Sequence, residues 1–173
     1  VVIQDIFFNK TSEYADVIFP ATAWGEHEAV YSACDRRFQR VHKLVDPDPN
    51  VKTDWEILCL VATAMGYPMH YNNTEEIWDE MISLSPKYYG ATYEKLEANY
   101  GIQWPCYTRD PEDKGTKFLH EGATFNKPEG KGHFYFFPFT PVKEKETEEF
   151  PLSLSTVREV GHYSVRTMTG NCR

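Results

Sequence analysis

The chain has 173 residues, of which 26 are acidic and 18 are basic, so its formal net charge at pH 7 is −8. This length suits one sizeable domain, or one domain with part of a second. A general nucleic-acid surface needs clustered lysine and arginine, so the acidic balance argues against a nucleic-acid partner. No apolar run approaches the roughly 20 residues of a membrane-spanning helix, and no signal-peptide pattern opens the chain.

The first 20 residues are predicted to form strands and turns. Residues 1–8 (VVIQDIFF) read as a buried strand, and Thr11 is expected to cap a short helical turn through Ala15. Residues 16–20 read as a second strand, which Pro20 ends because proline donates no ladder hydrogen bond. This strand–turn–strand order fits the carboxyl edge of an open α/β sheet, where ligands bind.

The next segment, residues 24–44, is polar and mixed, and we expect a loop and a hairpin. Arg36, Arg37 and Arg40 give it local positive charge.

The clearest helix signal lies at residues 53–66. Thr53 and Glu56 have the spacing of a capping box, and the apolar run over residues 55–65 is followed by Gly66, which can end a helix. Because this run is apolar on nearly every side, we expect a buried helix. Two further helices are predicted, at residues 75–84 and at residues 92–100, the latter closed by Gly101.

The composition then shifts to Pro, Gly, Lys, Asp and Thr. Residues 102–132 are predicted to be a long connection with one short strand at residues 117–120. Residues 133–139 (HFYFFPF) read as an aromatic strand, and a charged linker, residues 141–149, separates it from a last strand at residues 150–156.

These elements predict an α/β fold with an open, Rossmann-like sheet domain over residues 1–145. Residues 146–173 would begin a second domain. The chain opens on an apolar strand without an initiator methionine, and it stops at Arg173 before its last loop returns to any structure. We therefore expect a slice of a longer protein that supplies one share of a larger site.

The four cysteines, Cys34, Cys59, Cys106 and Cys172, are irregularly spaced. None forms a C-x-x-C pair, so we expect neither a zinc nor an iron–sulfur site built within this segment. Scattered thiols are more typical of a reduced intracellular protein than of a disulfide scaffold.

Polar residues at element ends are the candidate ligand contacts. Gln4 and Asp5 end the first strand, where a carboxylate can accept two hydrogen bonds from a ribose or a guanine edge; the alternative is that Asp5 makes a turn. Asp54 lies in the first turn of a helix, where the helix dipole alone favours a carboxylate, yet the same position can receive a donor pair from a base.

The third candidate group lies in the last loop: Arg158, Glu159, His162 and Ser164. The guanidinium of Arg158 suits bidentate recognition of a phosphate or carboxylate. No set of nucleophile, base and orienting group can be assembled, and the chain has no G-x-G-x-x-G motif and no P-loop. The residues alone therefore indicate an α/β ligand-binding fragment of unknown chemistry.

Several segments together resemble one family, the molybdopterin oxidoreductases. Residues 2–20 are similar to its "VVxQDxFxTxTAxxADVxLP" stretch, and residues 24–40 to its "W-x-E-x-x-G…N-x-x-R-R-x-Q" element. The segments KTDW and MGY resemble its dinucleotide-domain helix, and STVREVGHYS resembles the start of its C-terminal cap domain. The resemblance implies that this cap domain is a β-barrel, of which residues 146–173 would supply the first strand and loop. Within the family, residues 69–80, 89–95 and 102–106 resemble the catalytic subunits of formate dehydrogenases, particularly the hydrogenase-linked type.

The resemblance implies a bis-(molybdopterin guanine dinucleotide) cofactor that holds molybdenum or tungsten. It implies that Gln4, Asp5 and Asp54 hold one guanosine end, and that a pterin–phosphate portion contacts Arg158, Glu159, His162 and Ser164. His162 would be a hydrogen-bonding residue and not a general base. One departure is Ala21, which stands where a close relative has a serine.

The resemblance also implies what lies elsewhere. The iron–sulfur cysteines, the cysteine or selenocysteine metal ligand, and the catalytic histidine and arginine have no counterpart here, so this segment would hold no catalytic and no metal-ligating residue. The parent would oxidise formate to CO2 and pass electrons through a 4Fe-4S cluster to iron–sulfur or hydrogenase subunits in the cytoplasm. The alternatives are a nitrate reductase type of oxidoreductase and a noncatalytic molybdopterin-fold subunit; a free-standing guanine-nucleotide module is disfavoured by the missing glycine loop.

Overall fold

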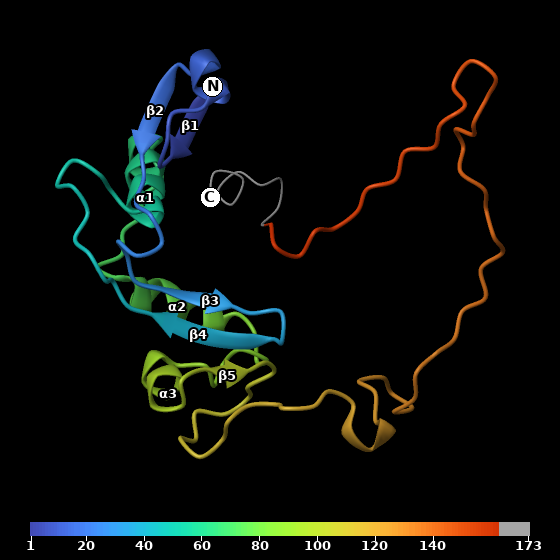
Figure 1. The fold of residues 1–173 in the computed structure, drawn as a ribbon. Helices are drawn as coiled ribbons and strands as arrows, with labels where there is room; N and C mark the ends of the chain where they lie inside the picture. Colours follow the sequence, from blue (N-terminus) through green and yellow to red (C-terminus); the bar gives the residue numbers. More distant parts are fainter. Residues whose placement is uncertain (163–173) are drawn as a thin grey trace. The chain divides into compact units, whose positions relative to one another are not determined.

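The computed structural model describes residues 1–162. Contacts between Cα atoms divide the chain into two units, Val1–Asn126 and a second that begins at Lys127. The first unit carries the regular structure drawn with labels in Figure 1. Together these elements form a mixed α/β fold with small sheets, which confirms the predicted fold class at that level.

The first sheet is a parallel pair. Strand β1 (Val2–Asp5) pairs with strand β2 (Val17–Pro20), with Val2 opposite Val17 and Asp5 opposite Pro20. A short 3-10 helix, Lys10–Tyr14, connects them. Its N-cap is Asn9 and not Thr11 as predicted, because the Asn9 side chain accepts from the backbone N–H groups of Thr11 and Ser12.

The second sheet is antiparallel and holds the main core. Strands β3 (Ala29–Ser32) and β4 (Arg37–Val41) form the expected hairpin, and β4 also pairs with the short strand β5 (Ile102–Gln103), which the sequence did not predict. Helix α2 (Thr74–Ser83) begins and ends one residue earlier than predicted, and α3 (Tyr93–Ala98) lies within its predicted range. The buried core formed by these helices, the two strands β4 and β5 and the adjoining loops consists of Phe38, Trp78, Ile82, Ala91, Tyr93, Leu96, Ile102 and Cys106.

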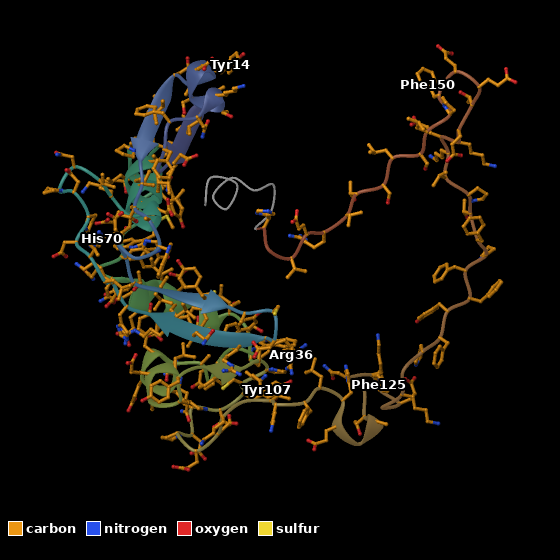
Figure 2. All side chains as sticks on the ribbon, in the orientation of Figure 1. Tyr14, Arg36, His70, Tyr107, Phe125 and Phe150 are labelled. Atoms are coloured by element: carbon orange, nitrogen blue, oxygen red, sulfur yellow. The ribbon has the colours of Figure 1, made fainter. Side chains whose placement is uncertain are left out.

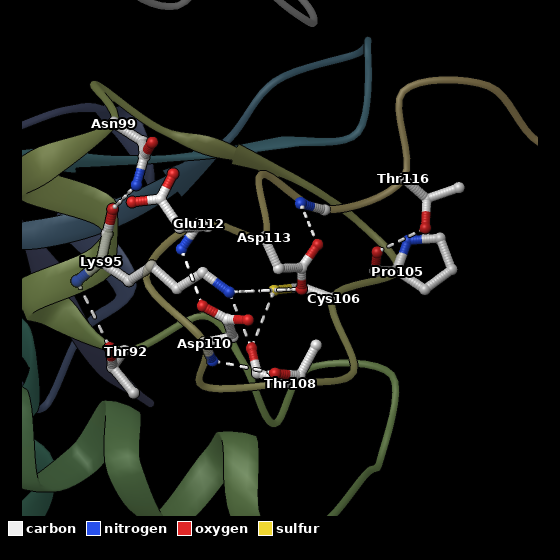
Figure 3. A network of polar contacts seen from close by, with 11 residues as sticks. Thr92, Lys95, Asn99, Pro105, Cys106, Thr108, Asp110, Glu112, Asp113 and Thr116 are labelled. Carbon is white, nitrogen blue, oxygen red and sulfur yellow. Dashed lines mark hydrogen bonds and ion pairs between the residues drawn. The ribbon is translucent and has the colours of Figure 1, made fainter.

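One charged side chain lies inside this core. Lys95, on α3, is 4% exposed, and its Nζ donates to the Thr108 carbonyl at 2.7 Å and lies 3.3 Å from the Asp113 carboxylate (Figure 3). Its Nζ also lies 3.6 Å from the Cys106 sulfur. Burial raises the pKa of the Cys106 thiol, although Lys95 opposes that rise. The cluster ties the loop after β5 to α3.

Helix α1 (Asp54–Ala64) begins and ends as predicted, with Thr53 as its N-cap and Gly66 in the left-handed region at φ 91°. The prediction that it is buried is wrong for the described chain. Only Ile57 and Cys59 are buried, whereas Leu58 and Leu60 are 57% and 56% exposed. A helix that is apolar on every side needs neighbours on every side, and the described elements cover only part of its surface.

Three predicted strands are absent from the described residues. Residues 117–120, 133–139 and 150–156 form no ladder. The aromatic side chains of residues 133–139 are exposed, with Phe134 at 103% and Phe136 at 91%. Aromatic residues favour strands because they pack on a pleated surface, but a strand also requires a backbone to pair with, and no ladder to these segments forms among residues 1–162.

Within the part of the chain that the structure describes, no helix is both long and apolar enough to cross a membrane.

Candidate functional site at the carboxyl edge of the parallel strands

Three segments of the chain meet at one edge of the parallel sheet: the ends of β1 and β2 and the start of α1. Because β1 and β2 run in the same direction and in register, Asp5 and Pro20 lie side by side at their carboxyl ends. The next residue, Ala21, donates its N–H to the Asp5 carbonyl at 3.2 Å and forms a parallel bridge with Lys52. Helix α1 starts just after Lys52, so its N-terminus lies at the same edge. This edge is where α/β sheets bind ligands.

The structure brings two of the predicted site residues into contact. The Gln4 side-chain amide donates a hydrogen bond to the Asp54 carboxylate, although 50 positions separate the two residues in sequence. Both side chains are accessible to solvent at this edge. The Asp54 carboxylate therefore combines the favourable field of the α1 N-terminus with a donor from β1, and it keeps free acceptor positions for further donors.

Asp5 is engaged in a turn, as the alternative interpretation of the sequence proposed. Its Oδ1 accepts the N–H of Phe7 at 3.2 Å, and its Oδ2 accepts the Asn9 side-chain amide at 2.9 Å. A carboxylate has about four acceptor sites, so these bonds leave capacity for a ligand. The turn also fixes the direction of the carboxylate.

The start of α1 is held by Glu56. Its carboxylate accepts the Thr53 backbone N–H at 2.9 Å and the Thr53 hydroxyl at 2.7 Å. Burial raises the pKa of Glu56, but these hydrogen bonds and the charge of Lys52 outweigh it and hold the pKa below its usual range. The capping arrangement thus places Asp54, the neighbouring residue, in a fixed first turn.

We expect the α1 cap to make stability pH-dependent. Because the pKa of Glu56 is lower in the folded than in the unfolded chain, its contribution is present above the unfolded pKa and is lost as the pH falls through the folded pKa. Glu56→Gln should therefore flatten the acid side of the stability profile, measured by urea unfolding at a series of pH values. Glu94→Gln, in the first turn of α3, is the control and should leave the profile unchanged.

The loop after β2 contributes groups that the sequence reasoning did not select. The buried Thr22 hydroxyl lies 3.0 Å from Nδ1 of His27, and the Glu26 carboxylate accepts the Ala23 N–H at 2.8 Å. A pocket of about 290 Å³ adjoins this loop and is lined by His27, Asp54, Trp55 and Trp78 among others. No sequence pattern marks His27, because its five-residue separation from Thr22 belongs to no motif.

The C-terminal candidates belong to the second unit. Arg158 and Glu159 are exposed, and Nε2 of His162 lies 3.8 Å from the Glu159 carboxylate. The His162 N–H also donates to the Glu159 carbonyl at 3.2 Å, which closes a turn. Ser164 lies outside the described residues.

Among residues 1–162, no group of three or more His, Cys, Asp or Glu side chains could hold a metal ion. The cysteines in this range are free thiols, with Cys34 exposed and Cys59 and Cys106 buried.

Parallel strands with polar residues at their carboxyl ends, followed by a helix that starts at the same edge, are an arrangement at which α/β proteins commonly bind ligands. Residues 1–64 match the family described as molybdopterin oxidoreductase. The chain belongs to this family, as the sequence resemblance predicted.

Curated relatives match nearly the whole chain. Formate dehydrogenase H of Escherichia coli is 54% identical over 99% of the chain, and an alpha subunit of a formate dehydrogenase from Methanococcus maripaludis is 40% identical over 99%. A nitrate reductase of Symbiobacterium thermophilum is 33% identical over 98%. The chain spans about a quarter of the length of these relatives, 24%, 25% and 24% respectively.

Proposed function

We propose that this chain is part of the catalytic subunit of a formate dehydrogenase and that its carboxyl-edge site holds the guanosine end of a bis-(molybdopterin guanine dinucleotide) cofactor. The observation that carries the proposal is the contact between Gln4 and Asp54, which joins two predicted site residues at that edge. The names of the most similar relatives support the formate dehydrogenase assignment.

The residues at the edge fit such a group. The Watson–Crick edge of guanine carries two neighbouring N–H donors, and a carboxylate is the side chain that accepts both. Asp54 supplies that carboxylate at a helix N-terminus, and Asp5 supplies a second one with its direction fixed by a turn. Gln4 would orient Asp54 and contact the base or ribose with its remaining amide atoms.

Residues 1–145 would then belong to the dinucleotide-binding, Rossmann-like domain, and residues 146–173 would start a C-terminal domain. In that second part Arg158 would pair with phosphate, while Glu159, His162 and Ser164 would donate or accept hydrogen bonds along the pterin portion. The bound cofactor, with molybdenum or tungsten, supplies the two-electron oxidation of formate to CO2. The residues of this chain bind and orient it.

In the whole protein, electrons would leave through a 4Fe-4S cluster to an iron–sulfur or hydrogenase subunit in the cytoplasm. A nitrate reductase is the second candidate, because one relative carries that name, but its identity to this chain is lower, 33% against 54%.

The test uses the whole protein, purified without oxygen. We expect formate-dependent reduction of a viologen dye. We also expect Asp54→Asn to lower the guanine nucleotide released by acid about tenfold, because the amide presents one donor where the carboxylate presented only acceptors. Asp79→Asn, on the exposed face of α2, is the control and should keep full nucleotide content.

The two readouts separate the two parts of the proposal. Unchanged nucleotide content in Asp54→Asn would remove Asp54 from the site. A preparation that carries metal and pterin but does not respond to formate would refute the formate dehydrogenase assignment and favour another substrate.

A further inference from the structure

A second pocket lies in the first unit. The residues that line it are distant in sequence from the parallel strands β1 and β2. It has a volume of about 390 Å³ and lies between the segment that follows β5 and the connection around residues 116–126. Four ring-bearing side chains line it, together with one lysine: Trp104, Tyr107, His120, Phe125 and Lys87. We call it the aromatic pocket; Tyr107 and Phe125 are labelled in Figure 2.

Hydrogen bonds fix the walls of the aromatic pocket. Arg36 adopts the left-handed region at φ 68°, and its guanidinium donates to the carbonyls of Trp104, Thr116 and Lys117. The Thr116 hydroxyl donates to the Pro105 carbonyl at 2.7 Å. The charge of Arg36 therefore serves to join the two segments that line the pocket, and a pocket held in this way is largely formed before a ligand arrives.

One wall is a stacked pair of rings. His120 and Phe125 have ring centroids 4.7 Å apart with an interplanar angle of 25°. Nδ1 of His120 lies 3.2 Å from the Thr124 carbonyl, so that nitrogen carries the hydrogen and the ring is held in one orientation. Flat rings of this kind favour a planar aromatic ligand, which packs on them in offset or edge-to-face geometry.

The lysine beside the aromatic pocket has no acidic partner among the described residues. The Lys87 ammonium lies 5.3 Å from the centroid of the Trp104 ring and forms no ion pair within residues 1–162. No aspartate or glutamate of the described chain lines the pocket, although the whole chain has a net charge of −8. A cation without an acidic partner at an aromatic pocket suits an anionic ligand.

We propose that the aromatic pocket binds a small planar aromatic anion, whose ring packs among Trp104, Tyr107 and Phe125 and whose carboxylate or similar acceptor is held by Lys87. This site is separate from the carboxyl-edge site and does not depend on the cofactor assigned there.

The test follows the indole N–H groups of the chain by NMR after labelling with ¹⁵N-tryptophan. The chain has four tryptophans, and Trp104→Phe assigns the signal of interest; phenylalanine variants of Trp24, Trp55 and Trp78 assign it by elimination if that variant does not fold. Naphthalene-2-carboxylate is the probe, and naphthalene-2-carboxamide is its neutral match.

We expect the Trp104 signal to shift with the carboxylate and the dissociation constant to be about tenfold larger for the carboxamide. Lys87→Met should weaken carboxylate binding by a similar factor, whereas Lys87→Arg should retain it. Lys117→Met is the matched control, since Lys117 also lies over a ring, that of Phe118, but does not line the pocket. An unmoved Trp104 signal, equal binding of both probes, or full binding by Lys87→Met would each overturn the proposal.

Discussion

Lys95→Met should lower the free energy of unfolding by about 3 kcal/mol, because it removes one member of a buried ion pair and leaves the other without its partner. The Lys95 side chain is 3% exposed, and the Asp113 side chain is 28% exposed. The substitution also leaves the Thr108 carbonyl without the donor that lies 2.7 Å from it (Figure 3). Urea unfolding of the chain, followed by circular dichroism, measures the loss.

Two comparisons show whether the cause is the unpaired charge. Lys43→Met removes a lysine that pairs with Asp46 at the surface and should leave the unfolding midpoint unchanged, since exposed pairs contribute little. The double variant Lys95→Met/Asp113→Asn should be less destabilised than the sum of the two single variants, because it removes both charges together. A loss for Lys95→Met as small as that of Lys43→Met would show that the pair does not hold the loop.

Gly115→Ala should destabilise the chain by about 3 kcal/mol, from a left-handed backbone and a steric clash combined. Gly115 has φ +76°, and a Cβ atom there would lie 2.1 Å from the Gln103 carbonyl oxygen and 2.7 Å from the Ile102 side chain. Both contacts are with β5, so the backbone would have to move away from the core. Urea unfolding again gives the magnitude.

Gly122→Ala separates the two contributions. Gly122 has a similar φ of +67°, but a Cβ atom there would meet nothing within 4 Å. Its alanine variant should therefore lose only about 1 kcal/mol, the cost of the left-handed conformation alone. Equal losses at the two positions would mean that the loop at Gly115 can shift without disturbing β5.

Local signals in the sequence predicted the local structure well. The spacing of Thr53 and Glu56 placed the start of α1, and Gly66 and Gly101 marked helix ends where the structure has positive φ. The helix predicted at residues 75–84 is α2, shifted by one residue at each end. Such signals succeed because caps and helix ends depend on hydrogen bonds between residues that are close in sequence.

Signals that depend on a partner segment failed. The aromatic residues 133–139 have high strand propensity, yet they form no strand within the described chain because no neighbouring backbone pairs with them. Strand β5 was missed for the opposite reason. Two residues carry too little pattern to predict, and it is pairing with β4 that makes Ile102 and Gln103 a strand.

The candidate site shows the same division. Local patterns placed Gln4, Asp5 and Asp54 at the ends of elements, and the resemblance of residues 2–20 and 24–40 indicated the family. The contact between Gln4 and Asp54, the turn that holds Asp5, and the hydrogen bonds of Arg36 at the aromatic pocket became evident from the three-dimensional structure. These contacts join residues up to 81 positions apart, and their geometry follows from how sheets and loops pack, which no local pattern encodes.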